Sequence, residues 1–310
     1  MELFHSELFR CIHFQGETGG MVLEDFSKRS EGEKELFGIV RKRAVVGAFL
    51  IYMGIFIVQI MVYAVIMLVM PFFLQSGTEV SGLLRDAAFR HLLSEIFALA
   101  ASVCYIIWCG FLYARSDWRK KADYKKVFCR HHLVQIFCAG FGGCFCIIVV
   151  LTVLQQVFPA FFADYQKGMD EFNTGSVRMF VYTLVLGPVA EELMFRGAIF
   201  DRLYLAFPFH IANFLQAALF AVYHRNLIQG IYAFLFGLLL GLIHHTGGSI
   251  WNNILAHILF NVTNFLVPVL YRMTAEKSMV WLALMAAACF AGFFYGAVGL
   301  VKEAKRDGCE

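Results

Sequence analysis

Three groups of polar residues interrupt an otherwise apolar stretch in the second half of the chain. In order, they hold two glutamates and an arginine, a single histidine, and a histidine with an asparagine: Glu191, Glu192, Arg196, His224, His257 and Asn261. A charged side chain near the centre of a bilayer costs roughly 3 kcal/mol, so such a set calls for a specific role. Carboxylate and imidazole groups are common acids and bases in enzymes. We therefore expect one buried polar site that can hydrolyse a bond.

The first group predicts different tasks for its two glutamates. Glu192 and Arg196 are four residues apart, so they share a helix face and can form an ion pair. Glu191 points about 100° away from Glu192, which leaves its carboxylate to face a cavity and take a proton from water. Pro188 removes one backbone hydrogen bond and loosens the helix just before them. The alternative is a packing role in which both glutamates share Arg196, and this group alone does not decide between the two.

The second group ends at His224, after a short apolar segment. By itself, this histidine is more readily explained as a helix-end residue hydrogen-bonded to a carbonyl group than as a catalytic group. We expect the same of His210, His244 and His245, which lie at the ends of apolar segments or in loops.

The third group is a polar stripe on a predicted helix. Asn253, His257 and Asn261 recur every four residues and so lie on one helix face, and Ser249 is suited to cap the start of that helix. A stripe of this kind can also join two membrane helices without any catalytic role.

The composition places these groups in a membrane protein. Hydrophobic residues make up 60% of the chain and charged residues 16%, whereas soluble domains carry about 25% charged residues. We predict an all-α, polytopic helix bundle that is integral to a lipid bilayer. The net charge of +3 is too small to indicate a nucleic-acid partner. The nine cysteines lie mostly within apolar stretches, where free cysteine packs as a small hydrophobic residue.

Eight apolar stretches are candidate membrane spans, for which roughly 20 residues are needed. They cover residues 44–73, 92–113, 133–157, 177–198, 211–223, 227–243, 250–270 and 279–300. The fifth and sixth are short, as broken or re-entrant segments covered by protein can be. The chain then divides into an N-terminal tail (1–43), three N-terminal spans (44–176), a catalytic core (177–301) and a C-terminal tail (302–310).

Charges in the loops predict the orientation of the chain. Basic residues precede the first span, fill the loop after the second and follow the last: Arg41, Lys42, Arg43, Arg115, Arg119, Lys120, Lys121, Lys125, Lys126, Arg130, Lys302, Lys305 and Arg306. Because cytoplasmic loops carry the excess of Lys and Arg, we predict that both termini are cytoplasmic and that the membrane is a bacterial plasma membrane. The polar segment 1–40 lacks the apolar core of a signal peptide, and Met21 is an alternative start to Met1.

Together, the three groups resemble a known family, the CAAX-protease and bacteriocin-processing (CPBP) membrane proteases, also called the Abi family. Its pattern of Glu-Glu-x-x-x-Arg, Phe-x-x-x-His and His-x-x-x-Asn is filled by Glu191, Glu192, Arg196, Phe220, His224, His257 and Asn261. The run Thr-Gly-Gly-Ser-Ile-Trp before the third group is also similar to the family. The resemblance covers about residues 180–265, so the first three spans and the tails fall outside it.

The resemblance implies an intramembrane endopeptidase that cuts a peptide bond of a membrane-anchored protein or peptide. Glu191 would activate the attacking water with help from His224, and His257 and Asn261 would stabilise the oxyanion. The alternative is that Glu191, His224 and His257 hold a divalent metal such as zinc. The sequence lacks the His-Glu-x-x-His helix of many zinc proteases, which favours the metal-free attack without deciding it. The supporting residues would be Glu192, Arg196, Phe220 and Asn253.

One geometric condition applies to the two histidines. On straight helices with cytoplasmic termini, His257 lies about 10 Å from the cytoplasmic face and His224 about 20 Å. They can share a site only if the fifth helix tilts or is broken, and Phe207-Pro208 at its start is a suitable place.

Two other classes of function remain open. A catalytically silent membrane immunity or partner-binding protein would use the same fold as a receptor. A transporter or proton relay would also bury ionisable groups, and symmetry between the two halves of the chain would favour it; the sequence shows none.

Overall fold

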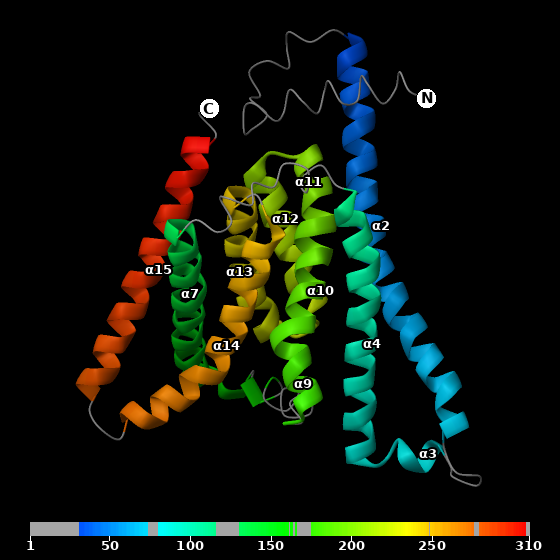
Figure 1. Cartoon of the computed structure of the whole chain (residues 1–310), viewed down its shortest axis with the longest axis vertical. Helices are drawn as coiled ribbons and strands as arrows, with labels where there is room; N and C mark the ends of the chain where they lie inside the picture. The colour runs from blue at the N-terminus through cyan, green and yellow to red at the C-terminus, as the bar shows by residue number, and fades with distance from the viewer. Residues whose placement is uncertain are drawn as a thin grey trace.

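The computed structural model describes residues 31–73, 80–115, 130–160, 162–163, 165, 175–247, 249–275 and 279–307, and every regular element in these ranges is a helix (Figure 1). The predicted all-α fold is therefore confirmed. Residues 1–30 of the predicted N-terminal tail, residues 116–129 of the basic loop and residues 308–310 of the predicted C-terminal tail lie outside the described residues.

Three long helices precede the first polar group. They are α2 (Glu31–Val69), which continues into the short helix η2 (Met70–Phe73), α4 (Ala87–Ala114) and α7 (Arg130–Val157), with the one-turn helix α3 (Val80–Leu83) between α2 and α4.

The segment that carries the first polar group is divided into five short pieces. They are α9 (Val177–Val181), the π-helical turn η3 (Tyr182–Leu186), α10 (Gly187–Met194), the π-helical turn η4 (Phe195–Phe200) and α11 (Asp201–Ala206). The hairpin of α12 (Phe209–Tyr223) and α13 (Leu227–Gly247) follows, and then α14 (Ile250–Ala275) and α15 (Met279–Asp307).

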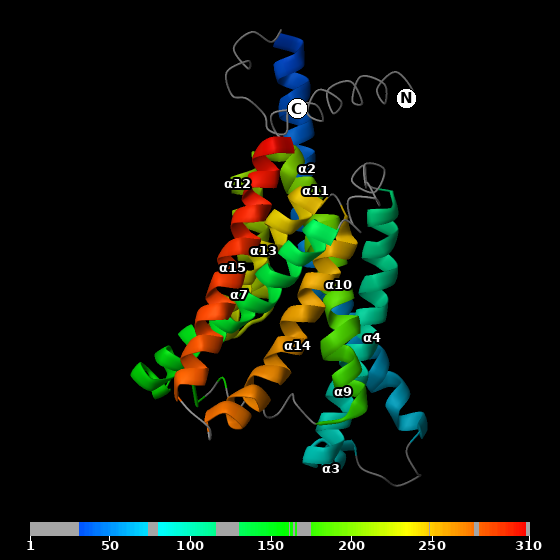
Figure 2. The same ribbon diagram turned by 60° about the vertical axis from the view of Figure 1, so that its left-hand side comes forward.

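The helices that carry the polar groups lie in the middle of the bundle. In Figure 1, α10, α12, α13 and α14 lie between α2 and α4 on one side and α7 and α15 on the other. Helix α7 packs against α15 and α14, α12 against α13, α10 against α4 and α11 against α2. The start of α2 and the end of α15 lie at the same end of the bundle (Figures 1 and 2).

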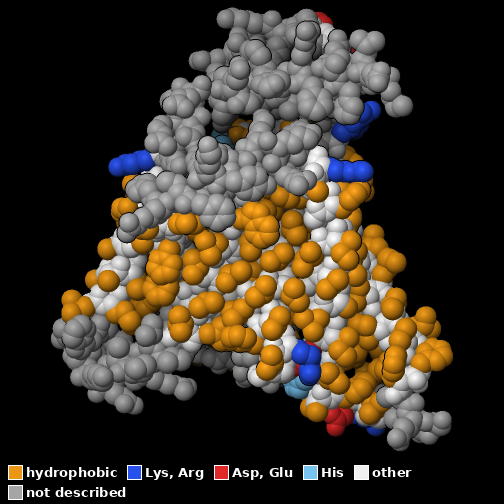
Figure 3. Space-filling view, in the orientation of Figure 1, with side chains coloured by type: hydrophobic (Ala, Val, Ile, Leu, Met, Phe, Trp, Pro, Cys, Tyr) orange, Lys and Arg blue, Asp and Glu red, His pale blue; other side chains and the backbone are white. Residues whose placement is uncertain are grey.

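Five helices of the described residues are long and apolar enough to cross a membrane. They cover Phe37–Phe73, Ala87–Ala114, His132–Val157, Leu227–Thr246 and Leu284–Lys302. Hydrophobic side chains cover the middle of the surface in Figure 3, with Lys and Arg side chains towards its ends. These are the properties of a multi-pass integral membrane protein. The other three predicted spans hold the polar groups: one is divided by the two π-helical turns, α12 has 15 residues and α14 carries the polar stripe.

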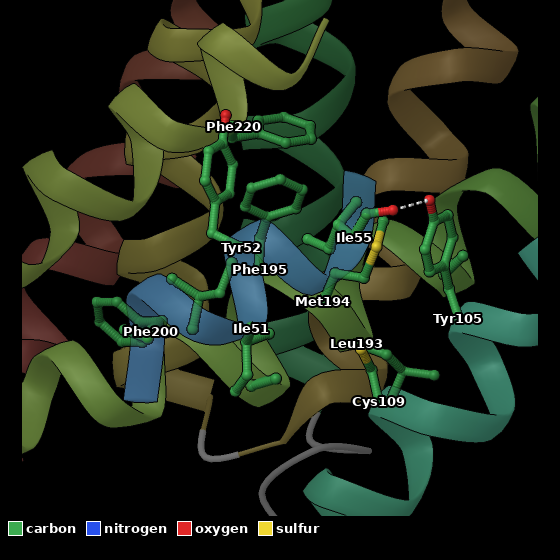
Figure 4. Packing of buried hydrophobic residues seen from close by; sticks show 14 of the residues in the cluster. Ile51, Tyr52, Ile55, Tyr105, Cys109, Leu193, Met194, Phe195, Phe200 and Phe220 are labelled. Atoms are coloured by element: carbon green, nitrogen blue, oxygen red, sulfur yellow. Dashed lines mark hydrogen bonds between the residues drawn. The ribbon is translucent and has the colours of Figure 1, made fainter. Parts of the chain in front are cut away.

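Two clusters of buried apolar side chains hold the bundle together. The larger one joins α2 and α4 to α10, η4 and α12 (Figure 4). Within it, the Tyr105 hydroxyl of α4 donates a hydrogen bond to the Ile55 carbonyl of α2 at 2.9 Å. The smaller cluster joins α7, α13, α14 and α15 through residues that include Ile136, Leu240 and Leu300. The polar groups lie where these two clusters meet.

Glycines on α13 allow α12 to approach it closely. A Cβ atom at Gly237 would lie 3.1 Å from Ala217, and a Cβ atom at Gly241 would overlap the amide oxygen of Asn213. The short distance between the helices lets the Asn213 amide donate a hydrogen bond to the Leu238 carbonyl at 3.0 Å. Small residues serve this purpose in many membrane helix pairs.

Gly241→Ala should therefore destabilise the protein by about 1–3 kcal/mol, because an added methyl group in a closely packed contact forces the helices apart. The unfolding temperature in detergent measures the effect. Gly292→Ala on α15 is the matched control, since no atom lies within 4 Å of its added Cβ, and alanine favours a helix. Equal unfolding temperatures for the two variants would contradict the prediction.

Candidate active site

The helix that carries the two glutamates changes register just before them. In the turn η3, the Gly187 N–H donates to the Tyr182 carbonyl, five residues back. Pro188 has no N–H with which to continue this register to the Thr183 carbonyl. The side-chain amide of Asn261 on α14 donates to the Thr183 carbonyl instead, at 2.7 Å. The irregular turn is thus completed from another helix, and such π-helical turns are frequent at functional sites.

The predicted ion pair between Glu192 and Arg196 is present and fully buried. Arg196 Nη1 lies 3.1 Å from Glu192 Oε1, and both side chains are 0% exposed. Arg196 Nη2 also donates to the Gly237 carbonyl at 3.2 Å, and the guanidinium carbon lies 4.7 Å from the centre of the Phe220 ring. Because a buried charge is stable only when it is paired and hydrogen-bonded, these contacts fix the position of Glu192.

His257 connects the two glutamates. Its Nδ1 lies 2.7 Å from Glu192 Oε1, and its Nε2 lies 3.5 Å from Glu191 Oε2. The sequence assigned Glu192 to Arg196 alone, and the contact with His257 is an addition that only the packing of α14 against α10 creates. The result is a buried chain of charged and polar groups from Arg196 through Glu192 and His257 to Glu191.

Glu191 stands at the accessible end of this chain. Its side chain is 15% exposed, whereas that of Glu192 is 0% exposed and that of His257 is 6% exposed. The predicted separation of the two carboxylates on the helix is therefore reflected in their surroundings.

His224 has the carbonyl partner that a helix-end histidine is expected to have. Its Nδ1 lies 2.8 Å from the Phe220 carbonyl oxygen. Because a carbonyl oxygen only accepts hydrogen bonds, Nδ1 carries the hydrogen, and Nε2 is left as an acceptor in the neutral ring. The carbonyl contact and a role in the site are thus compatible.

The Phe220 ring lies against both histidines. Its centre is 4.7 Å from the centre of the His224 ring and 6.1 Å from that of the His257 ring. The helical conformation is interrupted between α11 and α12, where the backbone of Phe207 and of Pro208 is extended. This break is at the place where the sequence predicted it. The His257 ring also contacts Phe236 at 5.2 Å, so it joins the two apolar clusters.

The remaining residues of the polar stripe join helices. The Asn253 amide donates to the Leu240 carbonyl of α13 at 2.6 Å, and the Asn261 amide binds η3. An asparagine amide has two N–H groups, so Asn261 keeps one for a further partner.

The donor types of Glu191, His224 and His257 suit a divalent metal such as zinc, but their placement does not. Within the described ranges, no three His, Cys, Asp or Glu side chains are close enough to hold a metal ion. The Nδ1 contacts of His224 with a carbonyl group and of His257 with Glu192 would leave Nε2 of each ring to bind a metal, so it is the separation of the three side chains that does not fit. The mechanism below therefore has no step through a metal.

Two features of this region were not predicted from the sequence. Gln216 of α12 is fully buried and donates to Asn213 and to the Gly237 carbonyl, both at 2.8 Å. His244, which we expected to have no role beyond a helix end, is also buried, and its Nε2 lies 3.6 Å from Asp201 Oδ1. The position of Gln216 within an apolar segment was a sequence signal that it could be buried and hydrogen-bonded. The contact of His244 with Asp201 had no such signal, because it depends on how α11 and α13 pack.

The fold and this centre define a class of protein: a polytopic helical protein with a buried glutamate–histidine centre of the kind that hydrolytic enzymes use. Residues 173–263 match the family described as type II CAAX prenyl endopeptidase Rce1-like, and this part of the chain is a domain of that family. The match contains all three polar groups, and it confirms the family resemblance drawn from the sequence.

A curated relative supports this assignment over part of the chain. The chain is 28% identical over 83 residues to YdiL of Bacillus subtilis (strain 168), a protein described provisionally as a membrane peptidase. The alignment covers 27% of this chain and 34% of YdiL, so the chain spans about a third of the length of that relative. No solved structure matches the chain.

Proposed function

We propose that the protein is an intramembrane endopeptidase that hydrolyses a peptide bond of a membrane-associated protein or peptide, and that Glu191 activates the attacking water. The observation that carries this proposal is the buried chain of Arg196, Glu192 and His257, which ends at the partly exposed carboxylate of Glu191. The Rce1-like match over residues 173–263 supports the same reaction.

In the proposed reaction, Glu191 accepts a proton from water while the water oxygen bonds to the carbonyl carbon of the substrate. The Glu191 carboxylic acid then gives this proton to the leaving nitrogen, and the peptide C–N bond breaks. His257 faces the same region with Nε2, and in its protonated form it donates a hydrogen bond from Nε2 to the oxyanion. The Glu192 carboxylate accepts a hydrogen bond from Nδ1 and thereby fixes the orientation of the ring.

His224 and Asn261 have the remaining proposed tasks. In the neutral ring, Nε2 of His224 accepts a hydrogen bond from the attacking water and orients it. The second N–H of Asn261 donates to the oxyanion, while the first holds the turn η3. Phe220 and Asn253 support the site by contact with the histidine rings and with α13.

The proposal extends to the placement of the chain in the membrane. We place all eight helical passes in a bacterial plasma membrane, with both ends of the chain in the cytoplasm. The exposed basic residues Arg41, Lys42 and Arg43 support this orientation, because they lie in the part of α2 that precedes its most apolar stretch.

The decisive experiment is a proteomic comparison of the peptides released from membrane vesicles. Vesicles that contain the wild-type protein should release peptides that vesicles with the Glu191→Gln variant do not release. Identical release from both would contradict the proposal. If the Glu191→Gln variant also complements a deletion of the gene in its host, a catalytically silent partner-binding protein would be the better description.

A further inference from the structure

The π-helical turn η3 changes which residues share a face of the helix with Glu191. Tyr182, the first residue of the turn, lies nine positions before Glu191. At about 100° per residue on a regular α-helix, nine positions place two side chains on opposite faces. Because the Gly187 N–H donates to a carbonyl five residues back instead of four, the turn takes up one additional residue. The two side chains are then separated as if by eight positions, which is about 80° and a neighbouring face.

Contacts at Gly187 place the two side chains on either side of this glycine. A Cβ atom added to Gly187 would lie 3.6 Å from Cζ of Tyr182, the ring carbon that carries the hydroxyl group. The Tyr182 ring therefore extends towards the C-terminal end of the helix, whereas most helical side chains point towards the N-terminal end. Glu191 is four residues after Gly187, and a helical side chain leans over the turn before its own Cα atom. The phenol group and the carboxylate thus approach each other across Gly187.

The surroundings of Tyr182 suit a role in the reaction. Tyr182 is partly exposed, as Glu191 is, and it interacts electrostatically with that carboxylate. The turn that carries Tyr182 is held by the hydrogen bond from Asn261 to the Thr183 carbonyl, so it is fixed to the helix that also carries His257. A phenol hydroxyl is a hydrogen-bond donor, and a fixed donor beside the general base is placed to contact the carbonyl group that the activated water attacks.

We propose that Tyr182 is a further active-site residue, whose hydroxyl group donates a hydrogen bond to the carbonyl oxygen of the scissile peptide bond as negative charge develops on that oxygen. This inference rests on the proposed peptidase function. The phenol keeps its hydrogen throughout, and the proton of the attacking water still passes to Glu191 and then to the leaving nitrogen. Tyr182 acts together with His257 and Asn261, but from the helix that carries the base. The register change in η3 then has a task, which is to bring this donor to the face of Glu191.

The test compares Tyr182→Phe, which removes only the hydroxyl group, with the matched control Tyr52→Phe on α2. The buried hydroxyl group of Tyr52 has no hydrogen-bond partner among the described residues, so its loss should leave activity and unfolding temperature near those of the wild type. Purified full-length protein in detergent is assayed with a membrane-anchored peptide that vesicles with the wild-type protein cleave and vesicles with Glu191→Gln do not. The inhibitor is a phosphinic analogue of this peptide, in which a tetrahedral, negatively charged phosphinate replaces the scissile amide and resembles the anionic intermediate.

Tyr182→Phe should lower kcat by about 100-fold, as expected for the loss of one donor to the oxyanion. KM should change little, because the contact becomes strong only as charge develops in the transition state. The affinity for the phosphinic analogue should fall by a similar factor, since the analogue carries the charge that the hydroxyl group stabilises. A merely structural role of Tyr182 would not lower kcat and this affinity in parallel. Binding of the analogue is measured below the unfolding temperature of each variant, so that a loss of stability does not obscure the result.

The outcomes separate the two proposals. If the wild-type protein cleaves no membrane-anchored peptide, the peptidase function fails, and the role of Tyr182 fails with it. If the wild type cleaves the peptide and Tyr182→Phe has the same kcat, the peptidase function stands and the role of Tyr182 is refuted. A variant that loses kcat but keeps its affinity for the phosphinic analogue would also refute this role, as would an equal loss of kcat in Tyr52→Phe.

Discussion

Replacement of Arg196 by methionine should destabilise the fold by about 3–5 kcal/mol, because removal of one partner of a buried ion pair leaves the other charge uncompensated. The Glu192 carboxylate is 0% exposed, and without Arg196 it retains only the His257 ring as a polar partner among the described residues. The Gly237 carbonyl also loses a donor. The yield of monodisperse protein in detergent and its unfolding temperature measure the effect.

The matched control is Arg115→Met, which removes an exposed arginine that lies over the Phe111 ring. Its stability should stay within about 0.5 kcal/mol of the wild type. The double variant Arg196→Met, Glu192→Leu replaces the whole pair by apolar side chains and should regain much of the lost stability without activity. If Arg196→Met unfolds at the same temperature as Arg115→Met, the ion pair does not support the fold as argued.

Glu191→Gln should lower the rate of peptide cleavage by about 1000-fold, since an amide cannot accept the proton of water and general base catalysis contributes 10²–10⁴ in rate. The unfolding temperature should change little, because the amide has nearly the size of the carboxylate and this side chain is 15% exposed. Single-turnover cleavage of a membrane-anchored peptide is the measurement.

Glu192→Gln is the isosteric control at the next position. It should lower the unfolding temperature as well as the activity, because Arg196 then faces no carboxylate in a fully buried position. The proposed division between the two glutamates fails if Glu191→Gln keeps about a tenth of the wild-type rate, or if it loses stability to the same extent as Glu192→Gln.

The sequence predicted the parts of the fold that depend on local spacing and composition. The helical class followed from long apolar stretches, and the contact of Glu192 with Arg196 followed from a separation of four residues. The break at Phe207-Pro208 followed from the restriction that proline places on the preceding residue. Each of these rests on residues close together in the chain.

Contacts between distant residues could not be predicted in this way. The approach of His257 to Glu192 joins residues 65 positions apart, and that of Asn261 to Thr183 joins residues 78 positions apart. The π-helical turn η3 depends on the contact of Asn261 with Thr183. Pro188 indicates where a backbone hydrogen bond is missing, but it does not indicate which side chain supplies the donor instead. The pairing of His244 with Asp201 was missed for the same reason.

The hydrogen bond from Asn261 to Thr183 has a consequence for the order in which the protein is made. Helices α9 to α11 are synthesised well before α14. Until α14 is in place, Glu192 lacks its contact with His257, and the Thr183 carbonyl of η3 lacks the hydrogen bond from Asn261. A nascent chain therefore carries the two glutamates without the residues that orient them. The proposed peptidase would stay inactive through most of its own synthesis and become competent only when α14 packs against α10.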